Sequence, residues 1–198
     1  MRWMKTVSFF CAMTAASATA FGQANLLKSP QDFVSIADPA ERSRMLFTEF
    51  SKVIESPRCQ NCHPVGQRPS QGDDMHPHQP LVVRGADDHG AVAMRCMTCH
   101  QAENFNPAGP PGNPKWHMAP ITMGWQGKSI GQICEQIKDP ARNGNRSLQQ
   151  IHDHMAYDDL VGWAWHPGAH RTPAPGTQVQ FGELIDAWIK AGAECPAP

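Results

Sequence analysis

Two short stretches of this chain share the spacing C-x-x-C-H: Cys59-Gln-Asn-Cys62-His63 and Cys96-Met-Thr-Cys99-His100. Two thiols three positions apart can reach the two vinyl groups of one porphyrin, and the histidine that follows can ligate its iron. A bare C-x-x-C also occurs in zinc sites and redox disulfides, but a histidine after both copies favours haem attachment. The sequence therefore predicts two covalently attached haem c groups, held by Cys59, Cys62, Cys96 and Cys99 and ligated by His63 and His100.

Residues 1–20 have the pattern of a secretory signal peptide. Arg2 and Lys5 precede an apolar stretch, and Ala18-Thr19-Ala20 offers a cleavage site between small residues. This apolar stretch is too short to span a bilayer, and no later one approaches the required length, so no membrane span is expected. The pattern predicts a periplasmic protein, in a compartment where thioether-bound haem and disulfides both persist.

Composition sets the fold class that we expect. The chain holds 18 Pro and 16 Gly in 198 residues, so much of it should be loop, and haem groups would supply apolar core. Loss of Arg2 and Lys5 with the leader lowers the basic residues from 17 to 15, against 18 acidic ones, for a net charge of −3. With no basic stripe, nucleic acid is excluded as a partner.

Helix signals flank a long irregular region. Asp38-Pro39 predicts a helix start, Ser56-Pro57 predicts its end, and the helix runs directly into Cys59. Further helices are expected at 129–138, 147–157 and 177–191. Nine prolines from Pro64 to Pro120 permit no long helix or regular strand there. We therefore expect an all-α, loop-rich fold: a lead-in at 21–37, then a single c-type cytochrome domain at 38–198 that wraps two covalently bound haems.

The two motifs lie 37 positions apart, and their flanks do not match, which excludes a tandem duplication of a complete small cytochrome. Each iron needs a sixth ligand if the haem only transfers electrons. For the first haem, His78 is the leading candidate, with His76 next, because the rigid His76-Pro77-His78 segment can fold back over it. For the second haem, Met123 and His154 are equal candidates. Each of these side chains could instead serve only in packing or on the surface.

Cys134 and Cys195 remain once the haem cysteines and Cys11 of the leader are set aside. In an exported chain, two remaining cysteines suggest a disulfide, and the alternative is a pair of buried free thiols.

Several longer stretches resemble a known family. They are Asp38-Pro-Ala-Glu-Arg-Ser-Arg, Gln71-Gly-Asp-Asp-Met-His-Pro-His78, Met123-Gly-Trp-Gln-Gly-Lys-Ser129, Lys138-Asp-Pro-Ala-Arg-Asn-Gly144 and Trp188-Ile-Lys-Ala-Gly-Ala193. They are similar to small exported dihaem c-type cytochromes whose members are often labelled as an isoquinoline 1-oxidoreductase subunit. The resemblance implies a cytochrome that accepts electrons from a periplasmic molybdenum hydroxylase. The chain has no iron–sulfur ligand pattern of its own, so hydroxylation would occur elsewhere.

Two functions from different classes follow. The first is electron transfer between redox protein partners, with the chain as carrier and not as enzyme. The second is a dihaem enzyme, peroxidase-like or acting on sulfur compounds, in which one iron keeps an open position. A haem-based sensor is a third reading, but the chain has no output domain.

Overall fold

The first long helix begins as its sequence predicts. The computed structural model describes residues 26–198. In it, the carboxylate of Asp38 accepts a hydrogen bond from the Ala40 amide, 3.0 Å away, and Pro39 occupies the first helical position of α1 (Pro39–Ile54). A short helix, α2 (Pro57–Gln60), follows at once and carries Cys59.

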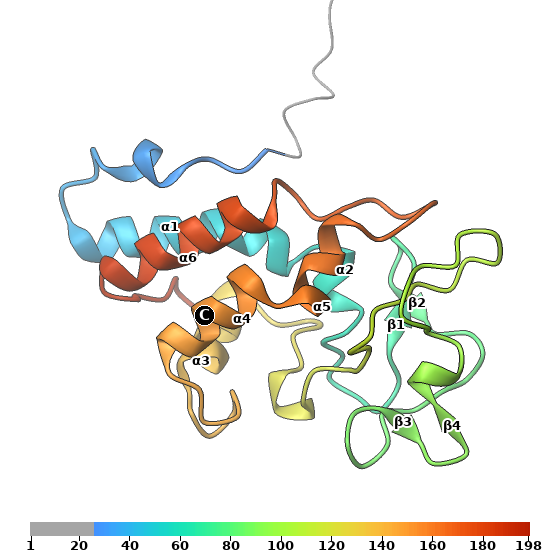
Figure 1. The fold of residues 1–198 in the computed structure, drawn as a ribbon. Coiled ribbons are helices and arrows are strands. Elements are labelled where there is room, and N and C mark those ends of the chain that lie inside the picture. Colours follow the sequence, from blue (N-terminus) through green and yellow to red (C-terminus); the bar gives the residue numbers. More distant parts are fainter. Residues whose placement is uncertain (1–25) are drawn as a thin grey trace, which may run out of the picture.

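Helix α1 packs along the last helix, α6 (Gln178–Lys190), and the two lie side by side in Figure 1. Thr177 and Gln180 form a reciprocal capping box at the start of α6. The contact between the helices is aromatic, with neighbouring rings 4.6–5.8 Å apart: Phe47, Phe50, Phe181 and Trp188. These buried rings form the centre of the core.

Two further helices, α3 (Ile130–Lys138) and α4 (Leu148–Tyr157), complete this helical half. Ser129 and Ser147 cap them, each with a glutamine three residues later that closes a capping box. The one-turn helix α5 (Asp159–Gly162) and the 3₁₀ turn η5 (Trp163–Trp165) follow α4. All four long helices therefore lie where the sequence predicts them.

The predicted disulfide is confirmed. Cys134 in α3 bonds to Cys195 beyond α6, with an S–S distance of 2.00 Å. Cys134 is fully buried, so the bridge ties the C-terminal end of the chain into the core.

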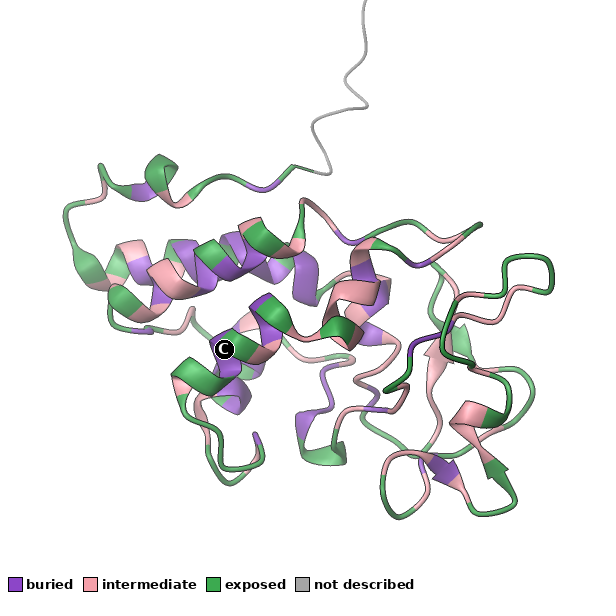
Figure 2. Ribbon diagram, viewed as in Figure 1, coloured by how far each residue is buried: buried purple, intermediate pink, exposed green. Residues whose placement is uncertain are grey.

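Residues 63–120, hereafter the loop segment, have little regular structure. They hold two antiparallel pairs of two-residue strands, β1 (Ser70–Gln71) with β2 (His76–Pro77) and β3 (Gly90–Ala91) with β4 (Met94–Arg95). A 3₁₀ turn, η3 (Cys96–Thr98), carries the second motif, and another, η4 (Ile121–Met123), lies just beyond the segment. Buried residues gather in the helical half, whereas the loop segment is largely exposed or half-buried (Figure 2).

The predicted signal peptide, residues 1–20, lies outside the described residues. Within the lead-in, a short 3₁₀ helix, η2 (Pro30–Phe33), buries Phe33 in the core. Among residues 26–198, no helix has the length and apolar character needed to cross a membrane.

A buried hydroxyl joins α1 to the chain after α6, which gives a first prediction. Ser43 Oγ donates to the Trp188 carbonyl, 3.2 Å away, and accepts from the Glu194 amide, 2.8 Å away. Ser43→Ala leaves that amide without its partner, so we expect the free energy of unfolding to fall by about 1–3 kcal/mol in a denaturant titration. Thr48→Ala, on the exposed side of the same helix, is the control, and an equal loss in both would contradict the prediction.

Candidate haem-attachment sites

The first motif is positioned by α1 and α2, which deliver the chain directly to its cysteines. Cys59 lies in α2 and packs against the hydrophobic core. Cys59 and Cys62 are free thiols, and burial raises the pKa of Cys59 to about 12 and that of Cys62 to about 11. A thioether bond to a vinyl group needs a reduced cysteine, which both residues supply.

The imidazole of His63 is held by a hydrogen bond at one ring nitrogen and by stacking on one ring face. Its Nδ1 lies 2.7 Å from the carbonyl oxygen of Met123, and its ring stacks on Trp125 with centroids 3.5 Å apart and planes 10° apart. Because a carbonyl can only accept, Nδ1 carries the proton and Nε2 keeps its lone pair. Burial lowers the pKa of His63 to about 3, so the ring is neutral at neutral pH. A neutral imidazole held through its other nitrogen is the usual form of a metal-ligating histidine.

The second motif repeats this arrangement in a different setting. His100 Nδ1 lies 2.8 Å from the Pro111 carbonyl oxygen, and the ring stacks on Trp116 with centroids 4.6 Å apart and planes 11° apart. Burial lowers the pKa of His100 as well. Cys96 and Cys99 are also free thiols, and Cys99 is exposed. The shared geometry therefore arises from two local sequences that do not match.

A cavity of about 520 Å³ opens at the second motif, within the usual size range of small-molecule sites. We call it the motif cavity. It lies between the loop segment and the chain around η5, and two residues of the first motif, Asn61 and Cys62, reach it. Its lining includes Cys62, Cys96, Cys99, His100, His78, Trp116, Trp163, Arg58 and Arg171.

His78, predicted for the first haem, lies beside the second motif. It lines the motif cavity, and its ring centroid is 5.9 Å from that of His100. Two imidazoles on opposite sides of one metal, each bonded at about 2 Å, have centroids roughly 6 Å apart. The separation therefore suits a shared iron at the second motif. His76 is exposed, and its Nδ1 lies 2.6 Å from Asp74 Oδ1.

His154, predicted for the second haem, lies near the first motif. It is in α4, and its charge contributes, after burial, to the lowered pKa of His63. Burial and the charge of Arg146 lower the pKa of His154 itself. The charge of a second imidazole, His117, also lowers the pKa of His154. The His117 ring itself stacks on His89, with centroids 5.0 Å apart. His154 is thus the predicted candidate whose charge acts on His63.

Met123, the other candidate for the second haem, belongs to the surroundings of the first motif. Its side chain is buried in the hydrophobic core, and its carbonyl accepts a hydrogen bond from His63 Nδ1. Gly124 follows directly, and a side chain there would meet the Pro64 carbonyl oxygen at 2.8 Å. This close approach keeps the chain from Met123 to Trp125 against the back of His63.

Sequence reasoning missed the supports of both histidines. The hydrogen-bond acceptors are backbone carbonyls, which carry no signal in residue type. The stacking tryptophans lie 16 positions after His100 and 62 after His63, so no common spacing reveals them.

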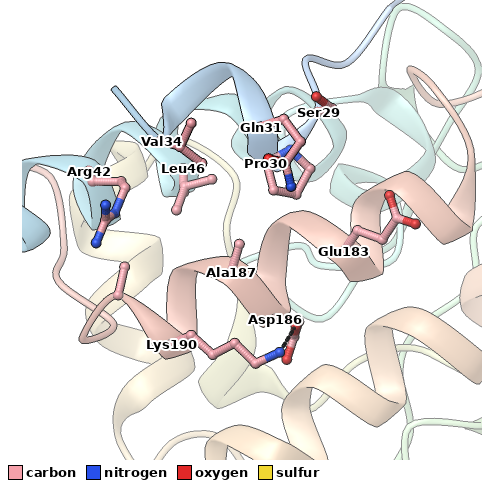
Figure 3. Close-up of a pocket in the computed structure, with 11 residues that line it drawn as sticks. Ser29, Pro30, Gln31, Val34, Arg42, Leu46, Glu183, Asp186, Ala187 and Lys190 are labelled. Carbon is pink, nitrogen blue, oxygen red and sulfur yellow. Dashed lines mark hydrogen bonds and ion pairs between the residues drawn. The ribbon is translucent and has the colours of Figure 1, made fainter. Parts of the chain in front are cut away.

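A second hollow, of about 570 Å³, lies away from both motifs (Figure 3). It is bounded by η2, α1 and α6, and its charged groups include an ion pair between Lys190 and Asp186 at 2.6 Å. It contains no motif residue.

Among residues 26–198, no three His, Cys, Asp or Glu side chains gather as they would to bind a bare metal ion. A c-type haem takes only one iron ligand from its motif, so its binding does not require such a cluster. Comparison of the chain with protein-family models, curated proteins and solved structures finds no significant match.

Proposed function

We propose that this protein is a periplasmic dihaem c-type cytochrome that transfers electrons between redox partners. One observation carries the proposal: both C-x-x-C-H histidines have Nδ1 against a backbone carbonyl and a tryptophan on one ring face. This arrangement leaves both Nε2 atoms available to ligate a metal. Two free thiols precede each histidine at the spacing that covalent attachment needs.

In this proposal each residue has a defined task. Cys59 and Cys62 anchor one haem, and Cys96 and Cys99 anchor the other. His63 and His100 ligate the irons through Nε2, and the carbonyls at Nδ1 make both imidazoles stronger donors. A haem bound in this way supplies a one-electron iron couple, which the surrounding residues tune through burial and ligation.

We further propose His78 as the sixth ligand at the second motif and His154 as the sixth ligand at the first. The 5.9 Å separation of the His78 and His100 rings supports the former, and the electrostatic effect of His154 on His63 supports the latter. Two filled positions favour electron transfer over the alternative, a dihaem enzyme with one open iron.

The proposed partners are redox proteins. The resemblance of the longer stretches to a family of dihaem cytochromes suggests a periplasmic molybdenum hydroxylase as electron donor. The Cys134–Cys195 disulfide is compatible with the proposed compartment, because disulfides persist where conditions are oxidising.

Spin state tests the function and the ligands together. We expect optical and EPR spectra of the exported protein to show two low-spin haems without a methionine–iron charge-transfer band. His78→Ala and His154→Ala should each convert one haem to a high-spin form that binds cyanide, because removal of the sixth ligand opens that position. His76→Ala and Met123→Leu are the matched controls. A wild-type protein with one high-spin haem would instead favour the enzyme.

A further inference from the structure

Arg58 precedes Cys59 of the first motif, yet its side chain lies on the wall of the motif cavity beside the second motif. The side chain is only 1% exposed. Its Nη2 donates to Asp73 Oδ1 at 2.6 Å and to the Gly72 carbonyl at 3.1 Å, and the guanidinium lies 6.0 Å from the ring centre of Trp163. Its Nε is buried and has no hydrogen-bond partner among the described residues.

A second guanidinium, that of Arg171, lines the same cavity. It donates to the backbone carbonyls of Pro167 and Gly109, neither of which carries a charge. Burial, and then the charge of Arg58, lowers the pKa of Arg171. The two cations are therefore close enough to repel each other.

Asp73 is the carboxylate that pairs with Arg58, and its charge also acts on Arg171. Burial alone would raise the pKa of Asp73, but hydrogen bonds from Thr172 and the charge of Arg58 lower it, so Asp73 is ionised. Two cations and one anion leave an excess positive charge on the cavity wall, where Arg58 is buried, Arg171 is half-buried and Asp73 is exposed. Such a charge is costly unless an anion offsets it, and the guanidinium fork is suited to a carboxylate.

Arg95 also lines the motif cavity, but it is fully paired with a carboxylate. Both of its Nη atoms donate to Asp87, at 2.9 and 2.6 Å, so its charge is already offset. The excess charge therefore belongs to Arg58 and Arg171, and Arg95 provides a matched control.

We propose that Arg58 and Arg171 form a carboxylate-binding site in the motif cavity, occupied by a propionate of the haem attached at Cys96 and Cys99. The inference rests on the proposed function, because it requires a haem at the second motif. In this proposal Arg58, which directly precedes the first motif, interacts electrostatically with the second haem.

The test compares Arg58→Gln and Arg171→Gln with Arg95→Gln. Loss of a cation beside a haem favours the ferric form, so we expect both site variants to lower the potential of the second haem more than that of the first. The propionate pKa should also rise in the site variants. The potential of the second haem should then fall as pH increases from mildly acidic to neutral, as the propionate loses its proton. In wild type and Arg95→Gln the fall should be smaller, since the histidines that line the cavity (His76, His78, His100, His117 and His170) are common to all the variants.

Added acetate separates the two possible sources of the carboxylate. We expect no shift in the wild-type potentials with acetate, because a propionate already fills the site. A saturable shift would overturn the propionate assignment, and site variants that behave like Arg95→Gln would overturn the site itself. If buried Arg58→Gln does not fold, as judged by circular dichroism, Arg171→Gln decides alone. The number of covalent haems per chain distinguishes failure of this inference from failure of the proposed function. Site variants that carry two haems with unaltered potentials would contradict this inference. A protein that carries no covalent haem would contradict the proposed function.

Discussion

Replacement of Cys96 and Cys99 with alanine is expected to yield an exported protein that carries one covalent haem instead of two. The reason is chemical, because each thioether needs a cysteine sulfur and the remaining motif keeps both of its own. Intact mass spectrometry of denatured protein measures the result directly, since a covalent haem stays with the chain.

The reciprocal pair, Cys59→Ala with Cys62→Ala, should also lose one haem and should reduce the yield of folded protein more. Cys59 packs against the hydrophobic core, whereas Cys99 is exposed. The control is Cys134→Ala with Cys195→Ala, which removes two cysteines but should retain both haems. If wild type and both motif variants carry the same number of haems, the proposed attachment sites are wrong.

Loss of the Cys134–Cys195 disulfide should lower the free energy of unfolding by roughly 4 kcal/mol. The bond spans 61 positions, and in the chain-entropy view it restricts the unfolded chain over that whole length. Urea titration of the Cys134→Ala, Cys195→Ala variant against wild type, both with full haem content, measures the loss.

A reductant supplies an independent control for this prediction. Wild-type protein in which only the disulfide is reduced should approach the variant in stability, because thioether-bound cysteines do not respond to thiols. If the variant is much less stable than the reduced wild type, the loss comes from the cavity at fully buried Cys134 and not from the missing cross-link.

The helical half could be predicted from sequence because its signals are local. Ser129, Ser147 and Thr177 each begin a helix through a side chain that caps an amide three residues away. The disulfide was predictable by elimination of the motif cysteines. The helix caps depend on residues close in sequence, and the disulfide follows from the number of cysteines that remain. Neither prediction requires knowledge of how distant segments pack.

The placement of His78 and His154 relative to the motifs could not be predicted in the same way. The sequence places His78 15 positions after His63, which suggested the first haem, yet the fold brings it beside His100. The loop segment has no hydrophobic period, so nothing local specifies the direction in which it folds back. The placement of Arg58 could not be predicted either, because its neighbour in sequence is Cys59 of the first motif whereas its side chain lines the motif cavity.

The separation between the helical half and the loop segment bears on the order in which the proposed haem groups would be attached. The aromatic contacts of α1 with α6 and the Cys134–Cys195 bond are formed by the polypeptide alone. Once that half has formed, Cys99 is still exposed to solvent, whereas Cys59 lies against the core. If the motifs attach haem as proposed, the order of loading should therefore follow burial, with the first motif loaded while the helices assemble and the second afterwards.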